Sequence, residues 1–328
     1  MNSTILRAEN VTKVFRDRSA SQGLKSRNFN AVDSVNLDIP RGKVYGLVGE
    51  SGSGKTTLAR CLLHLDPPTS GEVVFDGHRL RGTNRSDMRH LRHRMQIIFQ
   101  DPNNALNPKI SVYRSMCEGL SNRGIRGSEM DRKIAELTEM VSIPFGNLKR
   151  KPADFSGGQR QRLVIARALS MDPDFLVLDE PVSNLDVSIQ AQIVNLLMEL
   201  KDALNLTYLF ISHDLNLVSY VSDMVGVMYA GQLVECGPVK TVLEQPLHGY
   251  TRLLLSSAPH LTADVVPKDD SSFLPLSPAA ERGERGRGPG CSFRDQCLYE
   301  KESCGKPSQG MIDVGGGHLV ACEHAADS

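Results

Sequence analysis

The sequence has 328 residues, and its 38 lysine and arginine residues balance its 38 aspartate and glutamate residues, so the formal net charge is zero. This length accommodates one large domain or two modest ones, and a neutral chain lacks the global basic field that favours nucleic-acid binding. No apolar stretch approaches the ~18 residues of a membrane span, and residues 1–10 lack the pattern of a signal peptide. We expect a soluble chain that stays in the cytosol and serves any membrane from its surface, through partners.

The first motif in chain order is a strand, a glycine-rich loop and a helix. The run VYGLVG (44–49) predicts a short strand, and KTTLARCLLHL (55–65) has helical spacing. Between them, GESGSGKT matches the G-x-x-x-x-G-K-[ST] phosphate-binding loop (P-loop), whose backbone N–H groups wrap nucleotide phosphates. Lys55 is expected to reach the β- and γ-phosphates, and the Thr56 hydroxyl to ligate Mg²⁺. The predicted nucleotide-binding residues here are Gly49, Glu50, Ser51, Gly52, Ser53, Gly54, Lys55, Thr56 and Thr57.

Two further strands are predicted at 72–77 and 95–100, with the basic stretch 79–94 between them. No aromatic residue interleaves the arginines of that stretch, so a stacking platform for single-stranded nucleic acid is not indicated. We interpret the stretch as a solvated helix face. Residues from about 101 to 170 are mostly helical in pattern, and we interpret them as a helical insertion.

A second glycine turn lies near the end of this insertion. Ser156, Gly157 and Gly158 stand directly before a predicted helix, so they form another anion-binding helix N-terminus. One compact sheet cannot cradle a nucleotide from both sides if this turn lies on a separate insertion. The turn can close over a nucleotide if a second copy faces the first head-to-tail.

The segment FLVLDE (175–180) predicts a buried strand that ends in two acids. Asp179 is placed there to hold Mg²⁺ through its water shell, and Glu180 to orient and polarise the attacking water. Together with the P-loop, this strand predicts ATP hydrolysis that depends on Mg²⁺.

The remaining elements continue the alternation of helices and strands. An apolar helical stripe covers 187–204, a strand follows at 207–212, and a hairpin over 223–237 turns at Ala230-Gly231. Fully apolar strands that alternate with amphipathic helices predict an α/β fold with a parallel sheet covered on both faces. Residues 256–288 are rich in Pro, Ser, Gly and charge, which indicates a linker.

Four of the seven cysteines lie in the final segment, 289–328, separated by five, six and seventeen residues: Cys291, Cys297, Cys304 and Cys322. A structural disulfide framework is improbable in a cytosolic chain, so the cluster indicates metal. Paired Cys-x₂₋₄-Cys zinc knuckles are missing from this segment. Four thiolates at irregular spacing suit a [4Fe–4S] cluster, while zinc, free thiols and disulfides formed on isolation are the alternatives. Because the segment has few apolar residues, a metal would have to organise it.

The stretch FSGGQ, beginning at Phe155, resembles the signature motif of the ATP-binding subunits of ABC transporters, and the resemblance covers about residues 5 to 260. It implies a P-loop NTPase fold of the ABC ATPase type, with an antiparallel β subdomain and the helical insertion. It also implies a head-to-tail dimer that holds two ATP molecules between signature and P-loop motifs. Residues that the family pattern brings to the site are Phe15 (adenine stacking), Gln100 (Mg²⁺ and attacking water), Gln159 (signature), Asp186 (contact to the partner) and His213 (γ-phosphate).

The segments QDPNNALNPKISV (100–112) and LHGYTRLLLSSAP (247–259) narrow the resemblance to the peptide/nickel-uptake branch, and the residues after Phe15 resemble its second ATPase subunit. The implied domains are an ATP-binding domain at 1–255, the linker, and a metal-binding extension at 289–328. The implied partners are a second ATPase subunit, identical or different, two transmembrane permease subunits and, indirectly, a solute-binding protein. Similar tails in this branch are associated with a [4Fe–4S] cluster. The implied location is the cytoplasmic face of the membrane.

A soluble ABC ATPase that acts on DNA or ribosomes is the alternative. DNA-repair relatives carry long coiled coils or zinc modules between the P-loop and the signature, but only about a hundred residues separate those motifs here. Ribosomal relatives carry two cassettes in one chain, and this chain has one. The sequence therefore favours a transport ATPase with no nucleic-acid partner, and it leaves the transported solute open.

Overall fold

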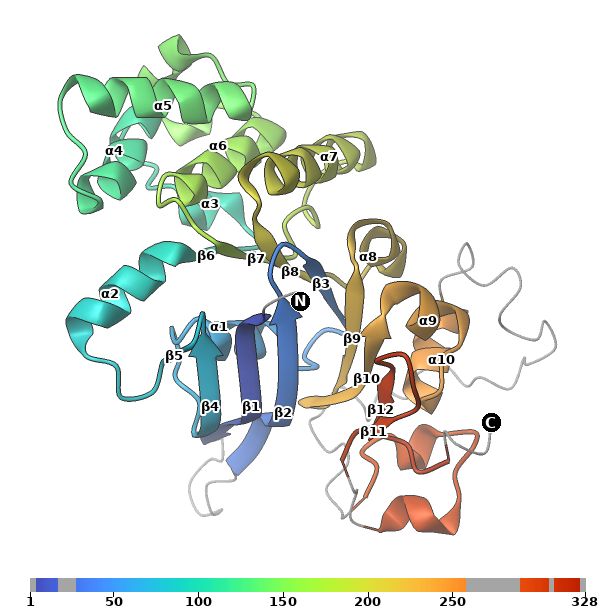
Figure 1. Cartoon of the computed structure of the whole chain (residues 1–328). Coiled ribbons are helices and arrows are strands. Elements are labelled where there is room, and N and C mark those ends of the chain that lie inside the picture. The colour runs from blue at the N-terminus through green and yellow to red at the C-terminus, as the bar shows by residue number, and fades with distance from the viewer. Residues whose placement is uncertain (1–3, 17–27, 258–289, 307–309, 325–328) are drawn as a thin grey trace, which may run out of the picture. The chain divides into compact units, whose positions relative to one another are not determined.

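The structure of the chain is a computed structural model that describes residues 4–16, 28–257, 290–306 and 310–324 (Figure 1). The described chain divides into two units. The first unit consists mainly of residues 75–211, joined by the short segment Pro40–Lys43. The second contains the described parts of 6–39, 44–74 and 212–328. Nearly all of the predicted linker at 256–288 lies outside the described residues.

Three parallel strands form the sheet of the first unit. Strand β7 (Phe175–Asp179) pairs on one side with β6 (Met95–Ile98) and on the other with β8 (Thr207–Ile211). All five residues of β7 and of β8 are buried. Continuous burial is what a strand covered on both faces requires, and it explains why these segments are apolar without alternation. The predicted parallel arrangement is confirmed for these strands.

Helices make up the predicted insertion. Figure 1 shows α4, α5 and α6 packed together, as their mutual contacts require. The described helices and short 3₁₀ turns of this unit are α2 (Arg85–Arg94), α3 (Pro102–Ala105), α4 (Val112–Asn122), α5 (Ser128–Met140), η1 (Phe145–Lys149), η2 (Pro152–Asp154), α6 (Gly157–Leu169) and α7 (Val187–Leu204), with the short strand β5 at His78–Arg79.

The basic stretch forms α2, whose side chains divide as the sequence predicts. Met88 and Leu91 are buried, while all arginines of 79–94 except Arg94 are exposed. Arg94 is the exception, because its guanidinium binds Asp76 and Asp174 at 2.6 and 2.5 Å. Asp76 also pairs with Arg41. One arginine of the predicted solvated face therefore fastens segments of the first unit together.

A sheet with mixed strand directions forms the frame of the second unit. Strand β3 (Val44–Val48) runs parallel to β9 (Met224–Tyr229), which pairs antiparallel with β10 (Gln232–Pro238). The hairpin between β9 and β10 turns at Ala230 and Gly231, which both have positive φ, 47° and 87°. Two such residues make the tight turn whose twist matches a hairpin. The predicted hairpin is confirmed.

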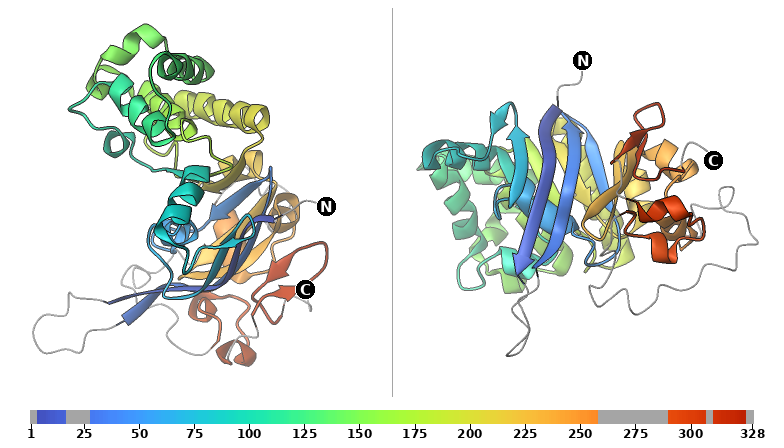
Figure 2. Two further views of the ribbon diagram at one scale, coloured as in Figure 1. Left: turned by 60° about the vertical axis from the view of Figure 1, so that its left-hand side comes forward. Right: turned by 90° about the horizontal axis from the view of Figure 1, so that it is seen from below.

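A second group of strands in this unit contains β2 (Asn28–Pro40), β1 (Thr4–Arg16) and β4 (Ser70–Phe75), in that order. Figure 2 shows the long strands β1 and β2 side by side. The described helices of the second unit are α1 (Lys55–Leu62), α8 (Leu215–Val221), α9 (Val239–Glu244) and α10 (Gly249–Ser256), with 3₁₀ turns η4 (Arg294–Gln296) and η5 (Glu302–Gly305).

The cysteine-bearing segment joins the sheet of the second unit. Strand β12 (Leu319–Val320) pairs antiparallel with β10, and β11 (Ile312–Asp313) pairs with β12. Phe293 and Val320 are 2% and 0% exposed. The segment has few apolar residues, as expected from the sequence, but it buries these two against the ATPase unit. Its order therefore draws on that unit's core as well as on any metal.

Across the described ranges, none of the helices combines the length and apolarity needed to cross a bilayer.

Candidate functional site

The P-loop connects β3 to α1 in the second unit, as the sequence predicts. Gly54 occupies the N-cap of α1 and supplies no side chain to hydrogen-bond the first turn. The first-turn N–H groups of a helix lack partners within the helix and carry partial positive charge. A glycine at the cap leaves this end open to an anionic ligand, because no cap side chain stands in the way.

Lys55 lies inside the loop rather than extending from it. Its side chain is 6% exposed, and Nζ donates to the carbonyl oxygens of Gly49 and Glu50, both at 2.7 Å. A third contact runs from Nζ to Ser53 Oγ at 3.3 Å. The loop thus holds the ammonium group at its centre through backbone dipoles, which place one positive charge where phosphates would approach.

Two glycines of the loop are required by close backbone approach. Gly49 has φ 148°, and a Cβ there would lie 2.2 Å from the Met228 carbonyl oxygen. Gly54 has φ 106°, and a Cβ there would lie 2.3 Å from the Ala31 carbonyl oxygen. Both positions exclude any other residue on steric and conformational grounds.

Two distant residues brace the loop, and sequence reasoning assigned neither a role there. The Gly231 N–H donates to the Ser53 carbonyl oxygen at 2.9 Å. The Glu50 N–H donates to the Tyr250 hydroxyl at 3.0 Å. The predicted hairpin turn is a signal for Gly231, but Tyr250 lies 200 positions from Glu50, and no local pattern could have identified it.

Phe15 and His213 also belong to the second unit. Phe15 is half-buried on β1, 5.8 Å from the Phe29 ring centroid, and Lys13 Nζ lies 5.5 Å from the Phe15 centroid. His213 is exposed and follows Ser212, whose N–H donates to the Leu47 carbonyl oxygen on β3 at 3.3 Å. That bond fixes the backbone beside His213 against the strand that leads into the P-loop.

The two acids predicted to hold Mg²⁺ and to activate water, Asp179 and Glu180, lie at the end of β7 in the first unit. Asp179 is 5% exposed and ends the strand. Glu180 follows with φ 48°, an uncommon conformation for a residue other than glycine, and its N–H donates to the Ile211 carbonyl oxygen at 3.0 Å. Gln100 Nε2 donates to Glu180 Oε2 at 3.1 Å. The structure therefore brings Gln100 and Glu180 together.

Residues 183–186 lie against the same corner. Asn184 Nδ2 donates to the Gln100 carbonyl oxygen at 3.3 Å. Asp186 is exposed at the N-cap of α7, and its side chain makes no hydrogen bond to the first turn of that helix. An aspartate at a cap usually bonds its own helix, so this carboxylate is presented outward.

The signature turn begins α6 with a reciprocal pair of capping bonds. Ser156 Oγ accepts from the Gln159 N–H at 3.3 Å, and Gln159 Oε1 accepts from the Ser156 N–H at 3.0 Å. Ser156, Gly157 and Gln159 are exposed. This capping box fixes the helix end while its polar groups face solvent.

Gly158 lies where α6 meets α7. A Cβ at Gly158 would be 2.7 Å from Ile189 Cγ2, whereas one at Gly157 would be 3.4 Å from Leu185 Cδ2. Only the second glycine is therefore demanded by packing within the chain. A Cβ at the first would make an ordinary van der Waals contact.

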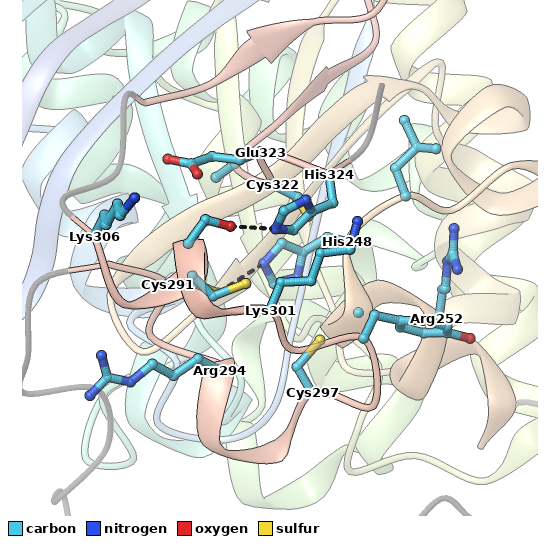
Figure 3. Close-up of a pocket in the computed structure, with 16 residues that line it drawn as sticks. His248, Arg252, Cys291, Arg294, Cys297, Lys301, Lys306, Cys322, Glu323 and His324 are labelled. Atoms are coloured by element: carbon cyan, nitrogen blue, oxygen red, sulfur yellow. Dashed lines mark hydrogen bonds between the residues drawn. The ribbon is translucent and has the colours of Figure 1, made fainter. Parts of the chain in front are cut away.

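The four cysteines of the final segment line one pocket of about 150 Å³ in the second unit. Figure 3 shows the Cys291 sulfur directed at the His248 ring, and the Sγ–Nε2 distance is 3.7 Å. All four thiols are free of disulfides. Burial raises the pKa of the Cys291 thiol to about 11 and lowers the pKa of His248 to about 4. Burial thus favours the neutral form of both groups.

The pocket has the right donor chemistry for a metal but not a preformed site. Within the part of the chain that the structure describes, no three His, Cys, Asp or Glu side chains are arranged so that they could share one ion. Binding would require the thiols to converge and deprotonate.

Glu235 anchors the residues beside this pocket. Its carboxylate is completely buried on β10 and accepts the backbone N–H groups of Leu247 and His248, both at 2.9 Å. His318 Nε2 lies 2.8 Å from Glu235 Oε1. One buried acid thus joins the start of α10 to the strand pair β11–β12.

Comparison with protein families agrees with this geometry. A family model described as ABC transporter matches residues 32–183. A second model, described as the C-terminal region of oligopeptide/dipeptide transporters, matches residues 234–304.

Similar proteins and solved structures extend the match. A putative peptide import ATP-binding protein of Brucella ovis is 41% identical over 326 residues, 97% of each chain. The dipeptide transport ATP-binding protein DppF of Lactococcus lactis is 45% identical over 81% of this chain and 85% of that protein. The oligopeptide transport protein OppF of Bacillus subtilis is 48% identical over 70% and 76%. CbiO1 of Clostridium perfringens, part of an ABC transporter complex, superposes with TM-score 0.64 at 30% identity, covering 79% and 98%.

The parallel strands, the P-loop and the acidic strand end define a P-loop ATPase. The chain belongs to the ABC transporter family, as an ATP-binding ATPase subunit of the oligopeptide/dipeptide import group.

Proposed function

We propose that this subunit hydrolyses ATP with Glu180 as the residue that activates water, and that hydrolysis energises the import of peptides or a related small solute. The hydrogen bond from Gln100 to Glu180 carries the proposal, because it orients a carboxylate directly after the buried strand that ends at Asp179. A carboxylate held in this way can accept a proton from water as the water attacks phosphorus. His213 is proposed to contact the γ-phosphate.

The nucleotide is proposed to bind on the P-loop. Lys55 supplies positive charge to the β- and γ-phosphates, and the α1 N-terminus supplies backbone N–H groups. Thr56, Asp179 and Gln100 are the proposed partners of Mg²⁺, which when bound neutralises developing negative charge on the phosphates. Phe15 offers a half-buried ring face on which adenine can stack.

The signature turn is proposed to act on a nucleotide held by a second ATPase subunit, identical or different. Ser156, Gly157, Gln159 and Asp186 are exposed, and a Cβ at Gly157 would make only an ordinary contact with Leu185 among the described residues. A solved ATP-binding cassette with TM-score 0.62 and 28% identity is itself described as dimeric and bound to ADP and phosphate. These observations support a head-to-tail pair with the signature of each subunit facing the other's P-loop.

The proposed partners beyond the ATPase pair are two transmembrane permease subunits and, indirectly, a solute-binding protein. The ATPase subunit is proposed to bind the permeases at the cytoplasmic face of the membrane. The relatives named for peptide, dipeptide and oligopeptide transport support this assignment. Affinity purification from detergent-solubilised membranes tests it: co-purified permeases are expected. Ribosomes or DNA in their place would instead favour a soluble ABC ATPase.

The catalytic assignment is tested with Glu180→Gln in the assembled transporter. The variant should bind MgATP normally and hydrolyse it roughly 10²–10⁴-fold more slowly, the usual size of a lost general base. Lys55→Ala is the contrasting control, because it should weaken nucleotide binding itself. Near-normal turnover by Glu180→Gln would overturn the role of Glu180.

The pocket lined by Cys291, Cys297, Cys304 and Cys322 is proposed to bind a metal centre, a [4Fe–4S] cluster or alternatively Zn²⁺. The support is chemical: four thiols line one pocket without disulfides, and thiolates bind both kinds of centre. Anaerobically purified protein should be brown and should lose that colour in Cys297→Ser. Colourless protein with stoichiometric zinc would contradict the cluster, and protein without metal would contradict both.

A further inference from the structure

One of the two distant groups that hydrogen-bond the P-loop is a buried hydroxyl. Tyr250, at the start of α10, is completely buried, and its hydroxyl accepts the Glu50 N–H at 3.0 Å. That N–H belongs to the same planar peptide unit as the Gly49 carbonyl, which accepts from Lys55 Nζ at 2.7 Å. The Gly49–Glu50 peptide is thus bonded at one end to Tyr250 and at the other to Lys55. Its orientation sets where the Lys55 ammonium group lies.

The ring of Tyr250 packs in a cluster with Tyr229 and Phe293. The ring centroids are 4.5 Å apart for Tyr229–Tyr250 and 5.5 Å apart for Tyr250–Phe293, and Tyr229–Phe293 closes the triangle at 5.3 Å. Tyr229 directly precedes the turn from which Gly231 bonds the Ser53 carbonyl. The ring cluster therefore borders both of the bonds that brace the P-loop from distant parts of the chain.

Phe293 connects this ring cluster to the cysteine-bearing segment. It lies between Cys291 and Cys297 in the sequence and is 2% exposed. The cysteines also touch the residues that lead into Tyr250: a Cβ at Gly249 would be 2.7 Å from Cys297 Sγ, and His248 Nε2 is 3.7 Å from Cys291 Sγ. Movement of these two cysteines would therefore change their contacts with the start of α10.

We propose that Tyr250 is a positioning residue of the P-loop, and that through Phe293 it makes nucleotide affinity depend on the conformation of the cysteine pocket. The inference rests on the proposed binding of ATP at the P-loop and adds a physical connection from that loop to the final segment. A change in the arrangement of the thiols, such as convergence on a metal, would act on the nucleotide site through Phe293, Tyr250 and Glu50.

Tyr250→Phe tests the hydroxyl alone, since the ring remains in its cluster. The Kd of the full-length subunit for a fluorescent ATP analogue with Mg²⁺ should rise about 3- to 10-fold, the size of one net hydrogen bond. In the assembled transporter the KM for ATP should rise by a similar factor, with kcat changed by less than about twofold, because the bond acts on binding.

Tyr208→Phe is the matched control. Tyr208 is also a buried tyrosine, and its hydroxyl donates to the Leu197 carbonyl oxygen at 2.9 Å in the first unit. This variant should lower the melting temperature by an amount comparable to Tyr250→Phe, while its Kd for the analogue stays at the wild-type value. Equal Kd values for both variants would overturn the positioning role of Tyr250.

Phe293→Leu tests the connection to the pocket. It keeps an apolar side chain but removes the ring, and the Kd for the analogue should rise several-fold. In the double variant with Tyr250→Phe, the fold-increase in Kd should be smaller than the product of the two single fold-increases, because both substitutions act through one contact path. An unchanged Kd in Phe293→Leu would overturn the coupling. A fold-increase in the double variant equal to the product of the two single fold-increases would overturn it as well.

Failure of the proposed function gives a different result. If the wild-type subunit does not bind the analogue, or if Lys55→Ala binds it normally, then ATP binding at this P-loop is refuted, and the inference with it. Normal wild-type binding together with unaffected Tyr250→Phe refutes the inference alone.

Discussion

Asp76 connects three segments of the first unit that are far apart in the sequence. Its carboxylate pairs with Arg41 and with Arg94, and Arg94 also binds Asp174 directly before β7. The hydrogen bond from Arg94 lowers the pKa of Asp76 below its ordinary value. Since the side chains in this network are about a quarter to two fifths exposed, solvent screening limits what each pair contributes.

The network predicts a specific dependence of stability on pH. An aspartate whose pKa is lower in the folded protein contributes stability above its unfolded pKa of about 3.9 and loses it as the pH falls through the folded value. Asp76→Asn should lower the free energy of unfolding by about 0.5–1 kcal/mol at pH 7, and the difference from wild type should shrink below about pH 4. Urea unfolding at a series of pH values measures this.

Asp202→Asn serves as the control, because the Asp202 side chain is 74% exposed and pairs with the adjacent Lys201. Its effect should be smaller at every pH. A difference between Asp76→Asn and wild type that persists unchanged at pH 3 would contradict the electrostatic explanation.

Glu235 is the residue on which we expect the largest loss of stability. Glu235→Ala removes the acceptor of two backbone N–H groups and the partner of His318, all at the buried start of α10. Buried donors left without an acceptor cost about 1–3 kcal/mol each, so the free energy of unfolding should fall by about 2–5 kcal/mol. Glu235→Gln, which keeps one acceptor oxygen, should lose less. Equal losses for the two variants would show that the carboxylate contributes only its volume.

Single residues differ in how well the sequence reveals them. Lys55 was predictable because its partners lie within six positions, so the motif contains the whole environment. Glu180 and Gln100 are 80 positions apart, and only resemblance to a family paired them. Tyr250 and Glu235 act through backbone groups of distant segments, and a backbone N–H leaves no trace in the identity of its own residue.

At the scale of elements, the N-terminus of α6 carries a specific prediction about ATP hydrolysis in the assembled transporter. Ser156→Arg would place a long charged side chain at the exposed cap. Binding of a fluorescent ATP analogue to the isolated subunit should be unchanged, because the P-loop is elsewhere in the sequence and on another element. Hydrolysis in the transporter should fall by about 10²-fold or more, as when donors facing the transition state are removed.

Ser128→Arg supplies the control for this change. Ser128 begins α5 and is exposed, so the substitution adds the same side chain to another helix start. Hydrolysis should remain near the wild-type rate. Loss of analogue affinity in isolated Ser156→Arg would show that the signature turn acts on the chain's own nucleotide.

Elements with one-sided or continuous apolar patterns were predicted well, because burial alone decides them. Helix α7 has the predicted bounds, and it ends where Asn205 adopts a left-handed conformation with φ 50°. Its last residue, Leu204, belongs to the predicted apolar stripe but is 40% exposed. The two-residue strands β11 and β12 were not predicted. Such short strands are set by the edge of β10 and not by any pattern of their own.

At the scale of the whole molecule, the final segment is a structural part of the second unit. It supplies β12 to the β10 edge, Phe293 to the ring cluster and His318 to Glu235. His318→Ala should therefore destabilise the full-length protein, by about 1–3 kcal/mol, because a buried carboxylate loses a partner. Differential scanning calorimetry should show this loss of stability. In a separate titration, the Kd for a fluorescent ATP analogue should change by less than about twofold. An unchanged melting temperature would contradict the anchoring role of the segment.

The pairing of β10 with β12 also orders events during protein synthesis. The ribosome releases Glu235 long before His318 and Val320, so for that interval the nascent chain presents an unpaired β10 edge and a carboxylate without its histidine. Chains fold from the N-terminal end as they emerge, and an open strand edge is a template for aggregation. Slow translation between the two segments would prolong this exposure, and a chaperone that covers β10 would be most useful in that interval.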